Sequence, residues 1–187
     1  MTRLLSLATL LVAGLALAAC QPSGRDSAEP LQTVERVDLD RYLGRWFEIA
    51  RFENSFERGC DGVTADYALR DDGLISVTNT CYQGGLDGER REASGRARIV
   101  DGSANAKLEV SFFGPFWGDY WVIGLDDDYQ WALVSEPQGR FLWILSREPQ
   151  IEGDALAARL AELEALGFDT SRLVYPEQWP DADSVRP

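Results

Sequence analysis

The 187-residue chain contains no histidine. This absence excludes serine–histidine–aspartate and cysteine–histidine nucleophile systems, and it removes a usual protein ligand of zinc and haem. Basic residues are also scarce, because 18 lysines and arginines are outnumbered by 31 acidic residues, which gives a net charge of −13. Nucleic acid is therefore an unfavourable partner, since its binding requires a basic surface. We interpret the acid excess as a source of solubility, and we predict no cofactor.

Clustered acidic residues occur at turns between apolar runs, at 71–72 and at 126–128. Aspartate hydrogen-bonds its local backbone and tolerates unusual dihedral angles, so turn formation explains both clusters. A calcium loop is the alternative for residues 126–128, but the glycine and the ligand-spaced glutamate of such loops do not follow them. The sequence therefore predicts turns at these positions and no metal site.

Residues 1–19 have the pattern of a lipoprotein signal peptide. Arg3 supplies a positive charge, an apolar run too short for a comfortable membrane span follows, and small residues precede Cys20. We predict cleavage before Cys20 and acylation of that cysteine, which would anchor the protein stably in a membrane. An ordinary secretory peptide is the alternative.

The residues after the predicted cleavage site indicate where the protein resides. Gln21 follows the cysteine, which by resemblance to bacterial sorting rules points to the cell outer membrane, with the domain on its periplasmic side. Residues 21–33 lack apolar periodicity, and we predict that 20–36 form a flexible tether. The remaining residues, 37–187, have the length of one domain.

Two cysteines remain besides Cys20, and both would be exported to an oxidising setting. Cys60 and Cys81 flank a predicted hairpin with its turn at 71–73, and counting outward from this turn brings them close to direct opposition. A hairpin of this kind can hold two cysteines at disulfide distance. We predict a structural disulfide. The alternative is a reactive thiol, for which Arg58 is the only basic neighbour.

Short apolar strands alternate with turn signals between Cys60 and Arg147, as an antiparallel up-and-down barrel requires. The predicted strands are 62–70, 73–81, 90–99, 106–113, 119–125, 129–135 and 140–147. A first strand enters after a helical turn at 38–42. Leucines at helical spacing predict a helix over 154–166, and a short strand is predicted at 172–175.

Three motifs along this pattern resemble the signatures of the lipocalins, small closed β-barrels that hold one apolar ligand. Gly44 and Trp46 form a Gly-x-Trp at the entry to the first strand, 118–123 lies at a later turn, and Arg147 ends the last barrel strand. Glycine permits a close backbone turn, and tryptophan can plug the end of a barrel. The stretches 51–59 and 111–116 resemble the bacterial branch of the family.

The resemblance implies an all-β fold, namely an eight-stranded up-and-down antiparallel lipocalin barrel with one C-terminal α-helix packed outside. It implies a barrel floor at which Arg147 lies over Trp46, beside Gly44, in a cation–π contact. It also implies that an apolar acyl ligand, a fatty acid or a lysophospholipid, is bound, stored or transported at the outer membrane. We predict no catalytic residue. Two alternatives stay open: a lipocalin-fold enzyme such as an isomerase or cyclase, and an envelope interaction protein whose barrel is filled.

Alternation along the strands suggests which aromatic residues line the interior. If Arg147 points inward, Trp143 and Phe141 do so too, whereas the strand at 119–125 leaves both of its faces open to choice. The alternative for each aromatic side chain is a packed core. The residues predicted to bind ligand are Trp143, Phe141, Tyr120, Trp131 and Phe113.

Overall fold

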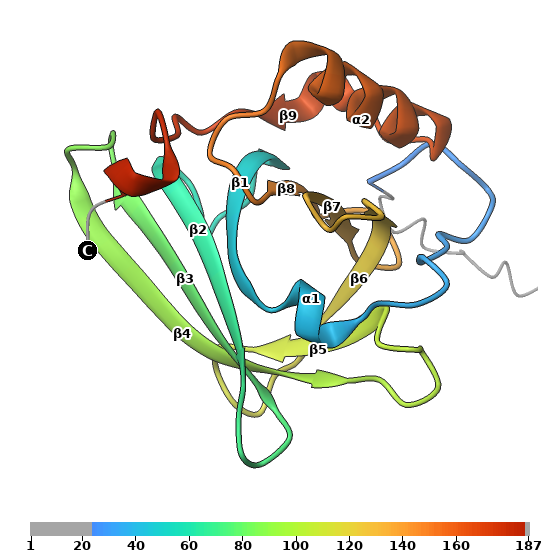
Figure 1. The fold of residues 1–187 in the computed structure, drawn as a ribbon. Coiled ribbons are helices and arrows are strands. Elements are labelled where there is room, and N and C mark those ends of the chain that lie inside the picture. The colour runs from blue at the N-terminus through green and yellow to red at the C-terminus, as the bar shows by residue number, and fades with distance from the viewer. Residues whose placement is uncertain (1–23, 186–187) are drawn as a thin grey trace, which may run out of the picture.

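Eight antiparallel strands follow one another around a closed barrel in the computed structural model, which describes residues 24–185 (Figure 1). β1 pairs with β2 on one side and with β8 on the other, and this closes the barrel. The predicted fold is thereby confirmed. The strands are β1 (Gly44–Phe52), β2 (Cys60–Leu69), β3 (Ile75–Gln83), β4 (Glu89–Ile99), β5 (Lys107–Ser111), β6 (Gly118–Leu125), β7 (Trp131–Ser135) and β8 (Leu142–Ser146).

Two helices have different relations to the barrel. The short helix α1 (Leu39–Tyr42) begins at Asp38, whose side chain accepts a hydrogen bond from the Asp40 amide, and it lies across one end of the barrel. The longer helix α2 (Gly153–Ala165) packs outside, as predicted, and buries Leu163 completely (Figure 1). Within residues 24–185 no helix combines the length and apolar character needed to cross a membrane.

Two hydrophobic layers result from the alternation of side chains along the strands. The inner layer fills the lower barrel around Trp46, and the outer layer joins β1, β6, β7 and β8 to α2 around Leu163. After α2 the chain forms the 3-10 turn η1 (Thr170–Arg172), the short strand β9 (Leu173–Val174) along the end of β1, and the 3-10 turn η2 (Ala182–Ser184).

The two ends of the barrel differ. We call the end crossed by α1 the floor. Because strands with odd numbers run away from α1, the loops that follow β1, β3, β5 and β7 gather at the opposite end, which we call the mouth. These loops are 53–59, 84–88, 112–117 and 136–141.

Residues 24–36 differ from the predicted flexible tether, because they pack along the outside of the barrel. The Gly24 amide donates to the Gln138 carbonyl at the mouth (3.0 Å), and the Val34 amide donates to the Val122 carbonyl on β6 (2.9 Å). Leu31 is buried in the outer layer, and this contact outweighs the polar composition of the segment. The predicted signal peptide, 1–19, and Cys20 lie outside the described residues.

Candidate functional site

The floor is built around Trp46, which is fully buried. The Arg147 guanidinium carbon lies 3.8 Å from the centroid of the Trp46 ring. The same guanidinium donates hydrogen bonds to the Arg45 carbonyl (2.6 Å) and the Leu43 carbonyl (2.9 Å). Arg147 therefore joins the end of β8 to the chain that enters β1, and the two floor residues inferred from the motifs lie together.

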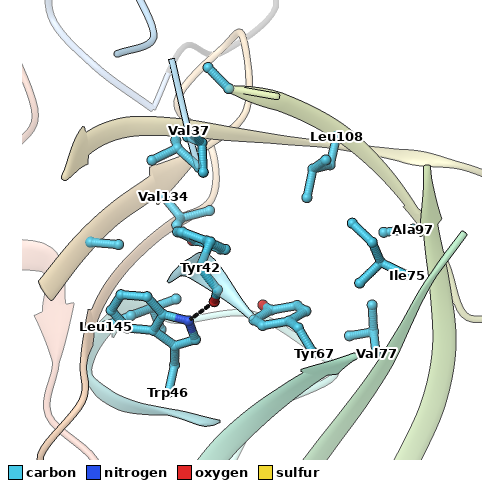
Figure 2. Packing of buried hydrophobic residues seen from close by; sticks show 13 residues of the cluster. Val37, Tyr42, Trp46, Tyr67, Ile75, Val77, Ala97, Leu108, Val134 and Leu145 are labelled. Carbon is cyan, nitrogen blue, oxygen red and sulfur yellow. Dashed lines mark hydrogen bonds between the residues drawn. The ribbon is translucent and has the colours of Figure 1, made fainter. Parts of the chain in front are cut away.

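Gly44 and Tyr42 complete the floor. Gly44 has φ of +91°, a conformation that favours glycine, and this accounts for the residue at the turn into β1. The Trp46 indole donates to the Tyr42 carbonyl (2.8 Å), and the two rings lie 5.0 Å apart (Figure 2). Every polar group of the Trp46 side chain is thus satisfied inside an apolar site.

Three tyrosine hydroxyl groups meet above the floor. The hydroxyl oxygens of Tyr42 and Tyr120 are 2.7 Å apart, and the Tyr67 hydroxyl donates to that of Tyr120 (3.2 Å). Burial raises the pKa of all three, that of Tyr67 to about 12, so the hydroxyl groups stay neutral at physiological pH. Tyr120 packs against the inner layer and is itself half-buried.

Aliphatic side chains form the wall around these hydroxyl groups. They come from β3 to β8 and pack with Trp46 in the inner layer, where Figure 2 shows several of them around the ring. Those that are almost fully buried are Ile75, Val77, Ala97, Leu108, Val122, Ala132, Val134 and Leu145. The lower interior is therefore lined by apolar side chains, and the tyrosine hydroxyl groups are neutral polar groups within it.

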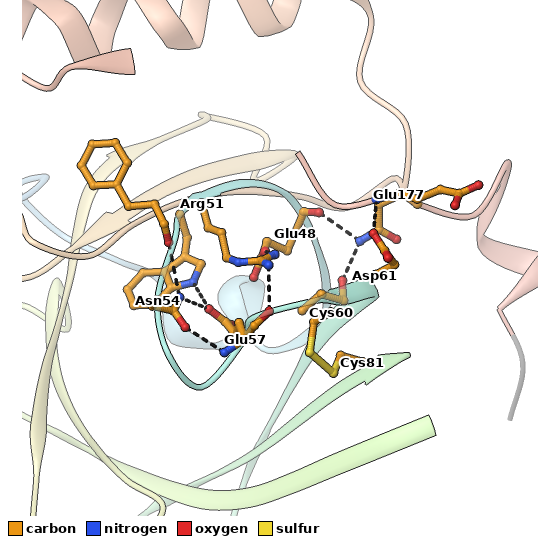
Figure 3. A network of polar contacts seen from close by, with 12 residues as sticks. Glu48, Arg51, Asn54, Glu57, Cys60, Asp61, Cys81 and Glu177 are labelled. Atoms are coloured by element: carbon orange, nitrogen blue, oxygen red, sulfur yellow. Dashed lines mark hydrogen bonds and ion pairs between the residues drawn. A yellow bond between two sulfur atoms is a disulfide. The ribbon is translucent and has the colours of Figure 1, made fainter. Parts of the chain in front are cut away.

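The interior near the mouth has the opposite character, because it holds a buried ionic cluster (Figure 3). Arg51 donates to the Glu48 carboxylate (2.7 Å) and to the Glu57 carbonyl (2.8 Å), and the Arg51 and Glu48 side chains are each only 4% exposed. The Glu57 carboxylate accepts hydrogen bonds from the Asn54 amide and from the Trp143 indole (3.1 Å for the latter). The cluster thus links β1, the following loop and β8.

The charges of this cluster do not balance, because the Glu48 and Glu57 carboxylates lie beside one guanidinium, that of Arg51, which pairs with Glu48. Burial raises the pKa of Glu48 well above its ordinary value, and the neighbouring Glu57 carboxylate raises it further, whereas Arg51 lowers it. Sequence reasoning missed this cluster. The sequence contains an indication of it, because Glu48 and Arg51 are charged residues in a strand that is otherwise apolar over 46–52.

The predicted ligand-binding residues divide into two groups. Trp143 and Tyr120 pack against the inner layer, and Phe141 stacks on Trp143 at the mouth with ring centroids 5.9 Å apart. The placement expected for Trp131 is wrong, because its ring packs in the outer layer with the Arg159 guanidinium of α2 at 3.7 Å. Phe113 is 80% exposed on a mouth loop, so it does not line the interior either.

The two cysteines of the predicted hairpin form a disulfide near the mouth, with Cα atoms 5.4 Å apart (Figure 3). Cys60 begins β2, and Cys81 lies near the end of β3. Their pairing removes the thiol on which the reactive-cysteine alternative depended. In residues 24–185 no group of three or more cysteine, aspartate or glutamate side chains is arranged to hold a metal ion.

A barrel plugged at one end, with an apolar interior below a polar mouth, defines the class of small β-barrels that hold an apolar ligand. The chain belongs to the lipocalin family, because the lipocalin-like domain model matches residues 37–178. The chain is 46% identical over 151 residues to the outer membrane lipoprotein Blc of Vibrio cholerae, covering 80% of this chain and 88% of that relative. It is 42% identical over 176 residues to the protein of that name in Escherichia coli, covering 94% of this chain and 98% of the relative.

Solved structures agree on the fold. Insecticyanin from the tobacco hornworm Manduca sexta superposes with a TM-score of 0.65 at 21% identity, covering 80% of this chain and 85% of insecticyanin. The similarity to the Blc proteins identifies the chain as a bacterial lipocalin of that branch, and it supports a location at the outer membrane.

Proposed function

We propose that this lipocalin binds a fatty acid or a lysophospholipid inside its barrel and stores or carries it at the outer membrane, where acylated Cys20 holds the protein. The observation that supports this proposal most is the gradient along the interior face. Aliphatic side chains pack around Trp46 in the lower interior, whereas ionic and amide groups gather around Glu57 near the mouth. An amphipathic ligand matches this order, with its acyl chain toward the floor and its head group toward the mouth.

Trp143 is the residue best placed to report binding. It is half-buried, belongs to the inner face, and donates to Glu57 at the level where chain and head group would meet. Each methylene that a ligand buries contributes up to about 0.8 kcal/mol, so affinity should rise with chain length until the interior is filled.

A pair of tryptophan variants tests the proposal. Fatty acids and lysophospholipids of increasing chain length are titrated into the mature protein, and tryptophan fluorescence is recorded. We expect saturation at one ligand per barrel, loss of most of the signal in Trp143→Phe, and an unchanged signal in Trp131→Phe, because Trp131 lies outside the barrel under α2. If ligands of every chain length leave the tryptophan fluorescence of the correctly folded protein unchanged, binding in the interior is refuted.

A second candidate is an enzyme on the same barrel, and one observation favours it. Glu48 is a buried acid with a raised pKa beside a second carboxylate, a combination found at general acid–base sites as well as in structural ion pairs. Liquid chromatography with mass spectrometry of fatty acid and lysophospholipid before and after incubation tests this candidate, because an isomer differs in retention time although its mass is the same. Conversion that Glu48→Gln abolishes would support it, whereas ligands recovered unchanged would leave binding as the function.

A further inference from the structure

Three phenylalanine side chains project into solvent from the mouth. Phe56 is 64% exposed on loop 53–59, and Phe113 and Phe116 are 80% and 75% exposed on loop 112–117. The stretch 112–118 contains no charged residue. Exposed apolar groups that gather at one end of a soluble domain indicate a contact surface.

The described N-terminus lies at the same end. The Gly24 amide donates to the Gln138 carbonyl (3.0 Å), and the Arg172 guanidinium donates to the Gly24 carbonyl (3.3 Å). Gly24 therefore leaves the barrel beside loop 136–141. Around the barrel this loop is the neighbour of both loops that carry the exposed phenylalanines, and the contact between Phe56 and Phe141 (ring centroids 5.8 Å apart) joins two of these three loops directly.

The chain between Gly24 and the predicted lipid attachment at Cys20 is short. Four residues span at most about 14 Å when fully extended. A lipid anchor at Cys20 therefore keeps the membrane surface within this distance of the mouth. The segment 24–37 runs on from the mouth to the floor, so an anchor at Cys20 favours a membrane below the mouth over one below the floor.

We propose that the mouth docks on the membrane that holds the anchor, with Phe56, Phe113 and Phe116 inserted among the lipids. This inference rests on the proposed acylation of Cys20. Trp117 supports it, because the Arg98 and Arg96 guanidinium carbons lie 4.3 and 5.3 Å from the centroid of its ring. Tryptophan and arginine side by side suit the level of the lipid head groups, where an amphipathic ring meets phosphate.

Docking in this orientation gives the mouth a role in ligand exchange. An acyl chain that leaves the bilayer at the docked mouth enters the barrel without crossing water. Anchoring raises the local concentration of membrane at this surface, so a few inserted side chains suffice, although they would bind weakly without the anchor.

Fluorescent probes at opposite ends of the barrel test the proposal. The acylated mature protein is prepared as Phe113→Cys and, separately, as Leu69→Cys, which is the matched control because Leu69 is 55% exposed at the floor end of β2. Each new thiol is labelled with an environment-sensitive dye, and the protein is reconstituted into phosphatidylcholine vesicles. Quenching is then measured with aqueous iodide and with phosphatidylcholine that carries a nitroxide at the head group.

We expect the probe at position 113 to be quenched by the nitroxide lipid and shielded from iodide, and the probe at position 69 to behave in the opposite way. Equal responses at both positions would overturn docking. Shielding from iodide without nitroxide quenching, together with a doubled mass in detergent, would assign the mouth to a second copy of the chain and would also overturn it. The mass of the purified protein reports the acyl groups separately, so failure of the anchor is distinguishable from failure of docking.

Discussion

The floor and the mouth of this barrel are made by the same strands, yet they are held together differently. At the floor, Trp46 is fully buried and Arg147 meets backbone carbonyls, so packing and hydrogen bonds are complete. At the mouth, a disulfide and an ionic cluster join the strands, and aromatic side chains remain exposed. The comparison indicates that packing and backbone hydrogen bonds stabilise the floor, whereas a covalent bridge and buried charges stabilise the mouth, where aromatic side chains stay exposed.

Removing the floor tryptophan should have the largest effect on stability. Trp46→Ala deletes a fully buried ring, and such changes typically cost about 3–5 kcal/mol. Chemical denaturation of the variant measures the loss. Phe113→Ala is the control at the mouth, where a side chain that is 80% exposed should contribute less than about 0.5 kcal/mol. Equal costs for the two variants would remove the distinction between floor and mouth.

Removing the mouth disulfide should come next. Cys60→Ser with Cys81→Ser opens a covalent loop with a sequence separation of 21, and the chain-entropy account assigns such a loop about 3 kcal/mol. Denaturation of the double variant gives the value. Thiol titration of denatured, unreduced mature protein checks the bridge itself, and two titratable thiols would contradict it.

Arg147→Ala should cost about 2 kcal/mol, from loss of the cation–π contact and from carbonyls left without a donor. Arg45→Ala is the matched control, because Arg45 also lies at the floor but forms an exposed ion pair with Asp66, and such a pair is worth about 0–1 kcal/mol. Thermal or denaturant unfolding of both variants decides whether the stability lost depends on the contacts of Arg147 or only on the removal of a positive charge at the floor. If Arg45→Ala lowers the free energy of unfolding as much as Arg147→Ala does, the loss of a positive charge would explain both effects.

The ionic cluster of the mouth predicts a dependence of stability on pH. Glu48 has a raised pKa in the folded protein, with Glu57, Arg51 and Tyr67 as its charged or titratable neighbours. Below the ordinary glutamate pKa of 4.5 both the folded and the unfolded state hold the proton. As the pH rises above that value the unfolded state ionises first, so the free energy of unfolding falls by up to about 1.4 kcal/mol per pH unit until the folded-state pKa is passed.

Glu48→Gln should abolish this decline between the ordinary glutamate pKa and neutrality. Exposed Glu35→Gln should retain it, and denaturation curves at a series of pH values compare the two variants with the wild type. The same slope in Glu48→Gln as in the wild type would show that the proton is held elsewhere.

The fold was predictable because local signals agreed with one another. Turn residues bounded each strand, the leucines of α2 recurred at helical spacing, and a Gly-x-Trp motif located the floor. The face on which an aromatic residue would lie was less predictable, since alternation fixes which residues share a face but not which face is inside. Register shifts between Glu48 and Ala50 and between Val122 and Gly124 further interrupt the simple count.

Trp131 and Phe113, which were predicted to lie inside the barrel, show why the inward face could not be predicted. Trp131 lies outside because α2 covers that part of β7 and provides the Arg159 guanidinium for its ring. On the neighbouring loop, β5 ends at Ser111, and Phe112 takes the inward position against Gly95, which leaves Phe113 in solvent. Both outcomes depend on tertiary contacts that no short window of sequence contains.

The hydrogen bonds of Arg147 have a consequence for the order of folding. They join residues that are 102 to 106 positions apart in the chain, from Arg45 to Arg41 on one side and Arg147 on the other. Contacts of such separation form late, because the intervening chain must first be ordered. We therefore expect the floor to be sealed late in folding, when β1 and β8 meet. Before that step we expect the apolar interior to be exposed, and exposed apolar surface favours aggregation.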